Sequence, residues 1–199
     1  MARKLQQRAI ETRKRILTAA RELFAERGYS GATADEIALR AKANKQRIYA
    51  YFGNKQQLFE TVVLQLFQEV DLFAQTDMQD CQPADLSRRV IAGFFKVHSE
   101  HPEFWRLLTW INLDEAIHVE RLIGARSHEN AAIREVFDRG IKEGVIKPML
   151  FRDYLYTLLA ASWFYFSNRR TLPLTLSPDL YSAGGRQLLI DEVAGLFNL

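Results

Sequence analysis

The hydrophobic residues of this chain recur every three or four positions over most of its length, which is the spacing of amphipathic helices. No alternation of apolar and polar residues persists long enough to predict a strand, and turn signals follow segments of helix length. The first helix is expected over residues 9–27, with Gly28 as its C-terminal stop. The pattern therefore predicts an all-α fold.

Further apolar stripes predict the later helices and one boundary between domains. A helix over residues 55–75 is followed by a polar stretch at 76–83 that has the composition of a linker. This stretch divides the chain into two predicted domains, residues 1–75 and residues 76–199. The remaining helices are expected at residues 84–100, from Pro102 onward, at 115–143 with a bend near Gly124, at 152–168, and at 178–197 with Ser177 as cap.

Residues 33–55 read as two short helices joined by a tight turn. Thr33 and Glu36 have the spacing of a capping box, so the first of these helices should begin there. Asn44 is an N-cap candidate for the second helix, in which Ile48 and Phe52 lie four residues apart and form a buried edge. The segment therefore predicts a helix-turn-helix.

The second helix of this pair leaves four polar side chains outside, those of Lys45, Gln46, Arg47 and Tyr49. Ammonium and guanidinium groups neutralise phosphates or pair with guanine, and an amide can pair with adenine. A short exposed helix with these groups fits the major groove of double-stranded DNA. The pair therefore predicts a DNA-binding function for the first domain.

The distribution of charge agrees with this prediction. Residues 1–55 hold 13 lysines and arginines against five aspartates and glutamates, a balance of +8, whereas residues 56–199 hold 14 against 19, a balance of −5. Such asymmetry suggests one end made for a polyanion and another made for a different ligand. Taken alone, the basic end has an alternative interpretation as a solvated tail.

The composition limits the other classes of protein. Hydrophobic residues make up 48% of the 199 residues, as expected of a soluble protein with a sizeable core, and no apolar run approaches the length of a membrane span. A single cysteine, Cys81, excludes an internal disulfide framework and favours the cytoplasm. The basic N-terminus has no apolar segment after it, so a secretory signal is not expected.

Residues 9–70 resemble the N-terminal domain of the tetracycline-repressor (TetR/AcrR) family of bacterial regulators. The segment H-P-E-F-W-R-L-L-T-W-I-N-L at residues 101–113 also looks like one widespread branch of that family, whereas the rest of the chain is similar only in its helical layout. The resemblance is carried by Ala20, Leu23, Phe24, Gly28, Thr33, Ile37, Ala38, Ala41, the run I-Y-A-Y-F at 48–52, Lys55, Leu58 and Phe59.

The resemblance implies a homodimer of about nine helices per subunit, with a three-helix DNA-binding head and a larger helical body. The bodies pair through their last two helices, and a pocket in the body takes a small effector. In the family, residues matching Thr33, Tyr49 and Lys55 hold the phosphate backbone. The residues that lie in or near the groove and read bases match Lys45, Gln46 and Arg47.

The chain departs from the family at the turn, where many members have glycine and valine in place of Lys42 and Ala43. Lysine with positive φ would carry backbone strain, so Lys42 either bears that strain, adopts a different turn or adds a phosphate contact. The basic arm formed by Arg3, Lys4 and Arg8 has two interpretations, a contact in the DNA minor groove or a tail with weak attraction for phosphate.

The second domain offers candidates for an effector pocket, because it combines many aromatic residues with a few polar ones. Each aromatic has an alternative interpretation as ordinary core. An aromatic pocket suggests a planar or hydrophobic effector. The effector-binding candidates are Phe94, His98, Trp105, Thr109, Trp110, Asn112, Trp163 and Phe166.

Other chemistry has little support in the sequence. Neither a catalytic constellation nor a glycine-rich phosphate loop stands out, so enzyme activity and a cofactor are not expected. His98 and His101 share a helix-turn spacing but lack further metal ligands, so a metal site is not expected either. Gly184 and Gly185 are expected within the last helix, where they would let a neighbouring helix approach closely, for example across a dimer interface.

The leading hypothesis is a ligand-responsive transcriptional repressor that binds a palindromic operator as a homodimer and is released by a small-molecule effector. The alternative is a non-specific or architectural DNA-binding protein without an effector. A third hypothesis, an enzyme that has kept a DNA-binding head, lacks any recognisable catalytic residues. Footprinting over one defined palindrome would favour the first hypothesis, and uniform protection of DNA would favour the second.

Overall fold

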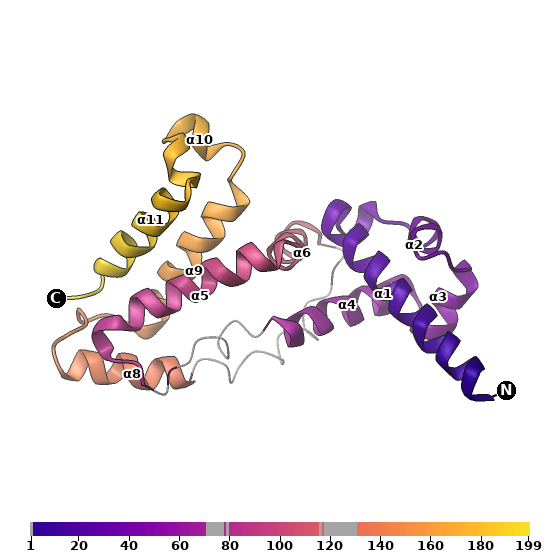
Figure 1. Ribbon diagram of the computed structural model, residues 1–199, viewed down its shortest axis with the longest axis horizontal. Coiled ribbons are helices and arrows are strands. Elements are labelled where there is room, and N and C mark those ends of the chain that lie inside the picture. The colour runs from indigo at the N-terminus through magenta and orange to yellow at the C-terminus, as the bar shows by residue number, and fades with distance from the viewer. Residues whose placement is uncertain (1, 71–77, 79, 116, 118–130) are drawn as a thin grey trace. The chain divides into compact units, whose positions relative to one another are not determined.

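The computed structural model describes residues 2–70, 78, 80–115, 117 and 131–199 (Figure 1). Over these residues the chain forms helices and no strand, with a single isolated β-bridge between Ile146 and Asn198. The all-α prediction is therefore confirmed. None of the helices in this part of the chain has the length and apolar character needed to cross a membrane.

The chain separates into two compact units, each with its own core. We call residues 1–70 with 103–125 the head unit, and residues 71–102 with 126–199 the body unit. The predicted boundary between residues 75 and 76 lies outside the described residues. The helices of the head unit are α1 (Ala2–Gly31), α2 (Ala34–Arg40), α3 (Lys45–Phe52), α4 (Lys55–Glu69) and α6 (Pro102–Leu113).

Helix α1 begins at Ala2, so the predicted start at residue 9 was wrong. The basic arm is helical backbone rather than an irregular tail, because nothing in the first eight residues breaks a helix. The predicted stop at Gly28 is confirmed as a kink, since this residue has φ 73° and ψ 179°. Such a conformation favours glycine and ends the regular helix before its last short turn.

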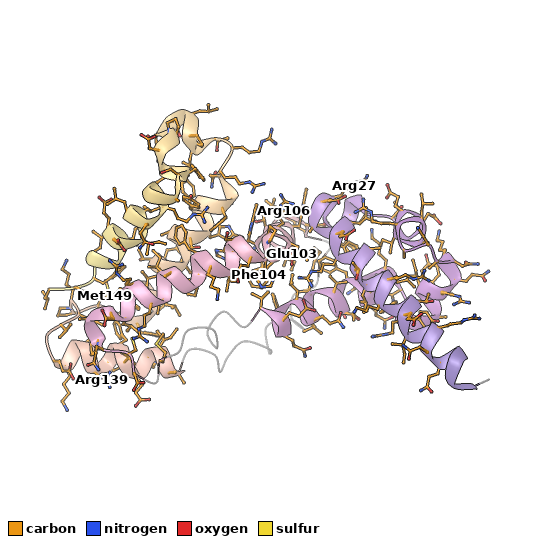
Figure 2. All side chains as sticks on the ribbon, viewed as in Figure 1. Arg27, Glu103, Phe104, Arg106, Arg139 and Met149 are labelled. Atoms are coloured by element: carbon orange, nitrogen blue, oxygen red, sulfur yellow. The ribbon has the colours of Figure 1, made fainter. Side chains whose placement is uncertain are left out.

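Helix α6 belongs to the head unit although it is distant from the other head helices in sequence. Arg21 of α1 forms ion pairs with both Glu69 of α4 and Glu103 of α6. Phe104 of α6, which Figure 2 labels beside Glu103, packs edge-on against Phe67 with 5.8 Å between ring centroids. These contacts fix α6 to α1 and α4, a grouping that the sequence did not predict.

The body unit is organised around the fully buried Tyr154 of α9. Its hydroxyl donates to Ser87 Oγ at 3.1 Å, and its ring packs against Phe137 and Phe197 at centroid distances of 4.9 and 5.0 Å. Burial raises the pKa of the Tyr154 hydroxyl. The elements of this unit are η1 (Pro83–Asp85), α5 (Leu86–Glu100), α8 (Ala131–Lys142), α9 (Phe151–Ser167), α10 (Leu172–Thr175), η2 (Pro178–Tyr181) and α11 (Ala183–Gly195).

Most predicted helices of the second domain are present, but the last one begins later than predicted. Ser177 caps only the short η2, and Ser182 caps α11 by accepting from Gly185 N–H at 2.9 Å. Helix α10 was not predicted. Helix α8 and the stop at Gly144, with φ 68°, match the end of the predicted helix over 115–143, whereas its predicted bend near Gly124 lies outside the described residues.

Candidate nucleic-acid interface

Local hydrogen bonds set the start of both helices of the helix-turn-helix. Thr33 Oγ1 accepts from Glu36 N–H at 3.2 Å, while the Glu36 carboxylate accepts from Thr33 N–H at 3.1 Å. This is the predicted capping box. Asn44 Oδ1 accepts from Gln46 N–H at 2.8 Å and caps α3, so that prediction is also confirmed. The sequence therefore determines where α2 and α3 begin through side chains next to them.

The turn between α2 and α3 takes the strained form. Lys42 has φ 49°, and within the described residues it is the one non-glycine residue with positive φ. The turn closes through a hydrogen bond from Ala43 N–H to Ala38 O at 2.9 Å. Of the interpretations open from the sequence, strain at Lys42 is confirmed, and its phosphate contact stays a prediction.

Helix α3 buries one edge and exposes the other. Ile48 and Phe52 are buried, as predicted, whereas Gln46 and Arg47 are exposed and Tyr49 retains 42% of its accessible surface. Backbone position alone thus places an amide, a guanidinium and a phenol on the solvent side of one short helix. Such an edge can supply both base contacts and phosphate contacts in a major groove.

Lys45, the first residue of α3, is already paired in the unbound protein. Its Nζ donates to Asp35 Oδ2 at 2.8 Å, and this hydrogen bond raises the pKa of the lysine against a smaller opposing effect of desolvation. Asp35 was missed in the sequence analysis. The only signal was an acidic residue in the first turn of α2, ten positions before Lys45, and that spacing does not reveal a contact between two helices.

The backbone N–H and the hydroxyl of Thr33 both already donate to a carboxylate within the protein. Its hydroxyl donates to Glu36 Oε2 at 2.7 Å, and the same carboxylate pairs with Arg27. The hydrogen bond from Thr33 is the largest of the effects that lower the pKa of Glu36. A phosphate that binds at Thr33 must therefore displace or share a carboxylate, which adds a cost to this predicted contact.

Lys55 lies at the first position of α4 and is only partly exposed. Its Nζ sits 4.4 Å from the centroid of the Tyr29 ring, and burial lowers its pKa, with the charge of Asp114 acting in the opposite direction. Asn54 caps α4 by accepting from Gln57 N–H at 2.9 Å. A cation at a helix N-terminus is well placed for a phosphate, because backbone N–H groups point the same way.

The predicted effector residues fall into both units, four in each. In the body unit His98 of α5 lies 5.9 Å from the Trp163 ring and 5.8 Å from the Phe166 ring, measured between centroids. His98 Nδ1 is also 2.7 Å from Ser162 Oγ, a neighbour that the sequence analysis missed because a single serine in an apolar helix carries no signal. Phe94 is buried on the same helix as His98.

The other four candidates lie on α6 in the head unit. Trp105, Thr109 and Trp110 line one groove together with Ala25 and Glu26 of α1. The fourth candidate, Asn112, is exposed. Its side-chain amide donates to Leu108 O of the same helix at 2.7 Å.

Comparison with known proteins agrees with this geometry. The family described as "Bacterial regulatory proteins, tetR family" matches residues 16–62, and the family described as "Tetracyclin repressor-like, C-terminal domain" matches residues 83–193. The chain is similar to the HTH-type transcriptional repressor NicS of Pseudomonas putida, with 30% identity over 181 residues that cover 87% of this chain and 84% of the relative.

Two further similarities extend this result. The HTH-type transcriptional repressor SCO4008 of Streptomyces coelicolor is 34% identical over 157 residues, which cover 76% of this chain and 77% of that protein. The crystal structure of a TetR family transcription regulator from Marinobacter aquaeolei VT8 aligns with a TM-score of 0.73 at 20% identity, covering 97% of this chain and 98% of that one. At that identity the structure supports the fold alone.

Proposed function

The chain belongs to the TetR family of DNA-binding transcriptional regulators, and we propose that it is a repressor whose homodimer binds a palindromic operator and is released by a small-molecule effector. The observation that carries the proposal is the exposed edge of α3, with Gln46, Arg47 and Tyr49 on a helix anchored by Ile48 and Phe52. In this role Gln46 and Arg47 read base edges, together with Lys45.

Phosphate contacts supply affinity in the proposed complex, and base contacts supply choice. Tyr49 donates its hydroxyl to the backbone from the exposed edge of α3. Thr33 and Lys55 hold phosphates from the starts of α2 and α4, the two helices that flank α3 along the chain. The division of roles explains why a single short helix suffices to select a sequence.

The proposed effector site in the body unit centres on the His98–Ser162 pair among the rings of Phe94, Trp163 and Phe166. Aromatic rings beside one buried polar pair favour a planar or hydrophobic molecule with a single polar group. An effector releases the operator only if it binds the released conformation more tightly than the DNA-bound one. Effector binding and operator binding should therefore weaken each other to the same extent.

The proposed homodimer uses the exposed apolar side chains of the last two long helices. Tyr156 and Phe164 of α9 retain 72% and 55% of their accessible surface, and Leu188 of α11 retains 59%. A second copy of the chain would cover them. A two-fold axis would present two α3 helices to DNA, which demands a palindromic site.

The alternative function is non-specific DNA binding without an effector. Letting the purified protein select duplexes from a random pool distinguishes it from the specific repressor. We expect one palindromic sequence to be enriched and to show a single footprint. Recovery of unrelated sequences with uniform protection would support the alternative. Both of the relatives described above are named repressors, which favours the specific regulator.

The same selected duplex tests the division of roles in the interface. Arg47→Ala should relax the preference at particular base pairs, at a cost of about 1–3 kcal/mol for a good bidentate contact. Lys55→Ala should instead weaken binding to the selected duplex and to a scrambled duplex equally. Titration of each variant with both duplexes measures the difference, and an equal loss on both duplexes for Arg47→Ala would contradict its base-reading role.

A further inference from the structure

We propose that the DNA-binding surface continues along α1, through a cationic groove that holds the phosphate backbone flanking the bases read by α3. The inference rests on the proposed DNA binding. The groove has a volume of about 850 Å³ and lies between α1 and the turn that joins α2 to α3. We call it the flank groove; its cations are Arg8, Lys14, Arg15, Arg40, Lys42 and Arg47.

Most of this charge is uncompensated within the described chain. Arg40 is the exception, because its guanidinium pairs with both carboxylate oxygens of Glu26 at 2.8 and 3.0 Å. The other five cations form no ion pair with any described carboxylate. Only two acidic residues, Glu11 and Glu22, line the groove against six cations. The groove therefore has a positive potential suited to a polyanion.

Helix α1 contributes Arg8, Lys14 and Arg15 to this charge. The helix starts at Ala2, so Arg8 and Arg15 lie two turns apart on one face of a continuous helix. Arg15 is further held by a hydrogen bond from its Nη2 to Thr12 Oγ1 at 3.3 Å. Cations held on one helix at two levels of the groove can contact successive phosphates of a backbone.

Arg47 connects the flank groove to the candidate interface. It lies on the exposed edge of α3 and also lines the groove, next to Lys42 in the α2–α3 turn. A backbone that leaves the bases at Arg47 therefore meets the groove without crossing an uncharged surface. The flanking base pairs would be held but not read, since only their phosphates are contacted.

The lining also identifies double-stranded backbone rather than unpaired bases as the ligand. None of the side chains that line the groove is aromatic. Surfaces for single strands combine positive charge with aromatic rings on which bases stack. A charged groove without such rings fits the outside of a duplex.

The test uses the full-length protein and the selected duplex in two lengths, the palindrome alone and the palindrome with added base pairs on both sides. The wild-type protein should bind the longer duplex more tightly. Arg8→Gln/Arg15→Gln should lose this advantage, and its slope of log K against log salt should fall by about 0.9 for each phosphate contact removed. The loss should be the same for any flanking sequence.

Arg169→Gln/Arg170→Gln is the matched control, because it removes the same charge from exposed positions of the body unit. It should keep the advantage of the longer duplex. Arg8→Gln alone leaves the hydrogen bond between Arg15 and Thr12 intact, so it should show a smaller effect of the same kind even if the double variant is unstable.

Two outcomes separate the failure of this inference from the failure of the proposed function. If the Arg8 and Arg15 variants bind the selected duplex with the wild-type salt slope and keep the advantage of the longer duplex, the flank groove does not contact DNA. If the wild-type protein selects no duplex from the pool, the proposed function is wrong, and the inference is overturned with it.

Discussion

Lys42 holds a left-handed backbone conformation in the turn between α2 and α3, with φ at 49°. For a residue with a Cβ this conformation costs about 1 kcal/mol relative to glycine, within the range given for left-handed L-residues. We therefore expect Lys42→Gly to raise the free energy of unfolding by about 1 kcal/mol, as measured by urea denaturation. Lys42→Ala removes the charge but keeps the Cβ, so it should give no such gain. If Lys42→Ala raised the free energy of unfolding as much as Lys42→Gly, the loss of charge and not the relief of strain would be the cause.

We expect Asp35 to control how much of the charge of Lys45 is available to DNA. Asp35→Asn removes the carboxylate that holds Lys45 Nζ at 2.8 Å, and it also removes repulsion between that carboxylate and phosphates. We expect the variant to bind a scrambled duplex several-fold more tightly, with a smaller ratio between the selected and the scrambled duplex. Titration with fluorescent duplexes at a fixed salt concentration measures both quantities.

Asp138→Asn provides the control for this prediction. Asp138 is an exposed aspartate of α8 in the body unit, and its substitution makes the same change in net charge. If Asp138→Asn strengthens binding to the scrambled duplex as much as Asp35→Asn does, then net charge and not the release of Lys45 is the cause.

The residues of the interface differ in how far the sequence could predict their surroundings. The exposure of Gln46, Arg47 and Tyr49 follows from helical periodicity around Ile48, so it was predictable. The pairing of Lys45 with Asp35 was not, because it depends on the angle between two helices, which no local pattern specifies.

At the scale of elements, helix starts were predictable where one residue alone offered a cap. Thr33 and Asn44 are such residues, and both predictions were confirmed. The start of the last helix was predicted wrongly, because Ser177 caps only η2 and Ser182 caps α11. Next to this cap, η2 approaches α11 closely, since a Cβ at Gly185 would lie 1.9 Å from Asp179 O; a close approach at this glycine was predicted, but its partner was not.

The contact between α1 and α6 also depends on a glycine. Gly28 is required there for two independent reasons. Its φ of 73° favours glycine, and a Cβ at this position would lie 2.7 Å from the Trp110 ring. We expect Gly28→Ala to lower the free energy of unfolding by about 2–4 kcal/mol, as the sum of backbone strain and overpacking. Thermal and urea denaturation measure this loss.

Gly144→Ala is a matched control for backbone strain alone. Gly144 has φ 68°, but a Cβ there would meet no atom within 4 Å. It should cost only about 1–2 kcal/mol, so the excess loss at Gly28 reports the contact with Trp110. Equal losses at both glycines would mean that the close contact between Gly28 and Trp110 contributes nothing to stability.

At the scale of the whole molecule, charge and apolar surface are segregated along the chain. The first 55 residues carry a balance of +8 and include α1, α2 and α3, whereas the remainder carries −5. The exposed apolar residues of α9 and α11 lie in the acidic part. In the proposed function, long-range attraction would direct DNA to the basic first 55 residues, and the apolar surface of α9 and α11 would serve self-association, so that the two functions could be perturbed separately.

Leu188→Glu tests that separation. A carboxylate at this exposed position of α11 would be buried without a partner in the proposed dimer, so we expect the variant to sediment as a monomer in analytical ultracentrifugation. Binding to a duplex with a single half-site should be unchanged, since α3 is untouched. Binding to the palindrome should fall by at least about 100-fold, because linking two sites typically contributes that much.

Leu174→Glu makes the same chemical change on α10, where the side chain retains 85% of its accessible surface. It should remain dimeric and bind the palindrome normally if the interface is confined to α9 and α11. A monomeric Leu174→Glu would extend the interface to α10, whereas a dimeric Leu188→Glu with full affinity for the palindrome would contradict pairing through α11. The two substitutions together therefore locate the surface that positions both α3 helices on one operator.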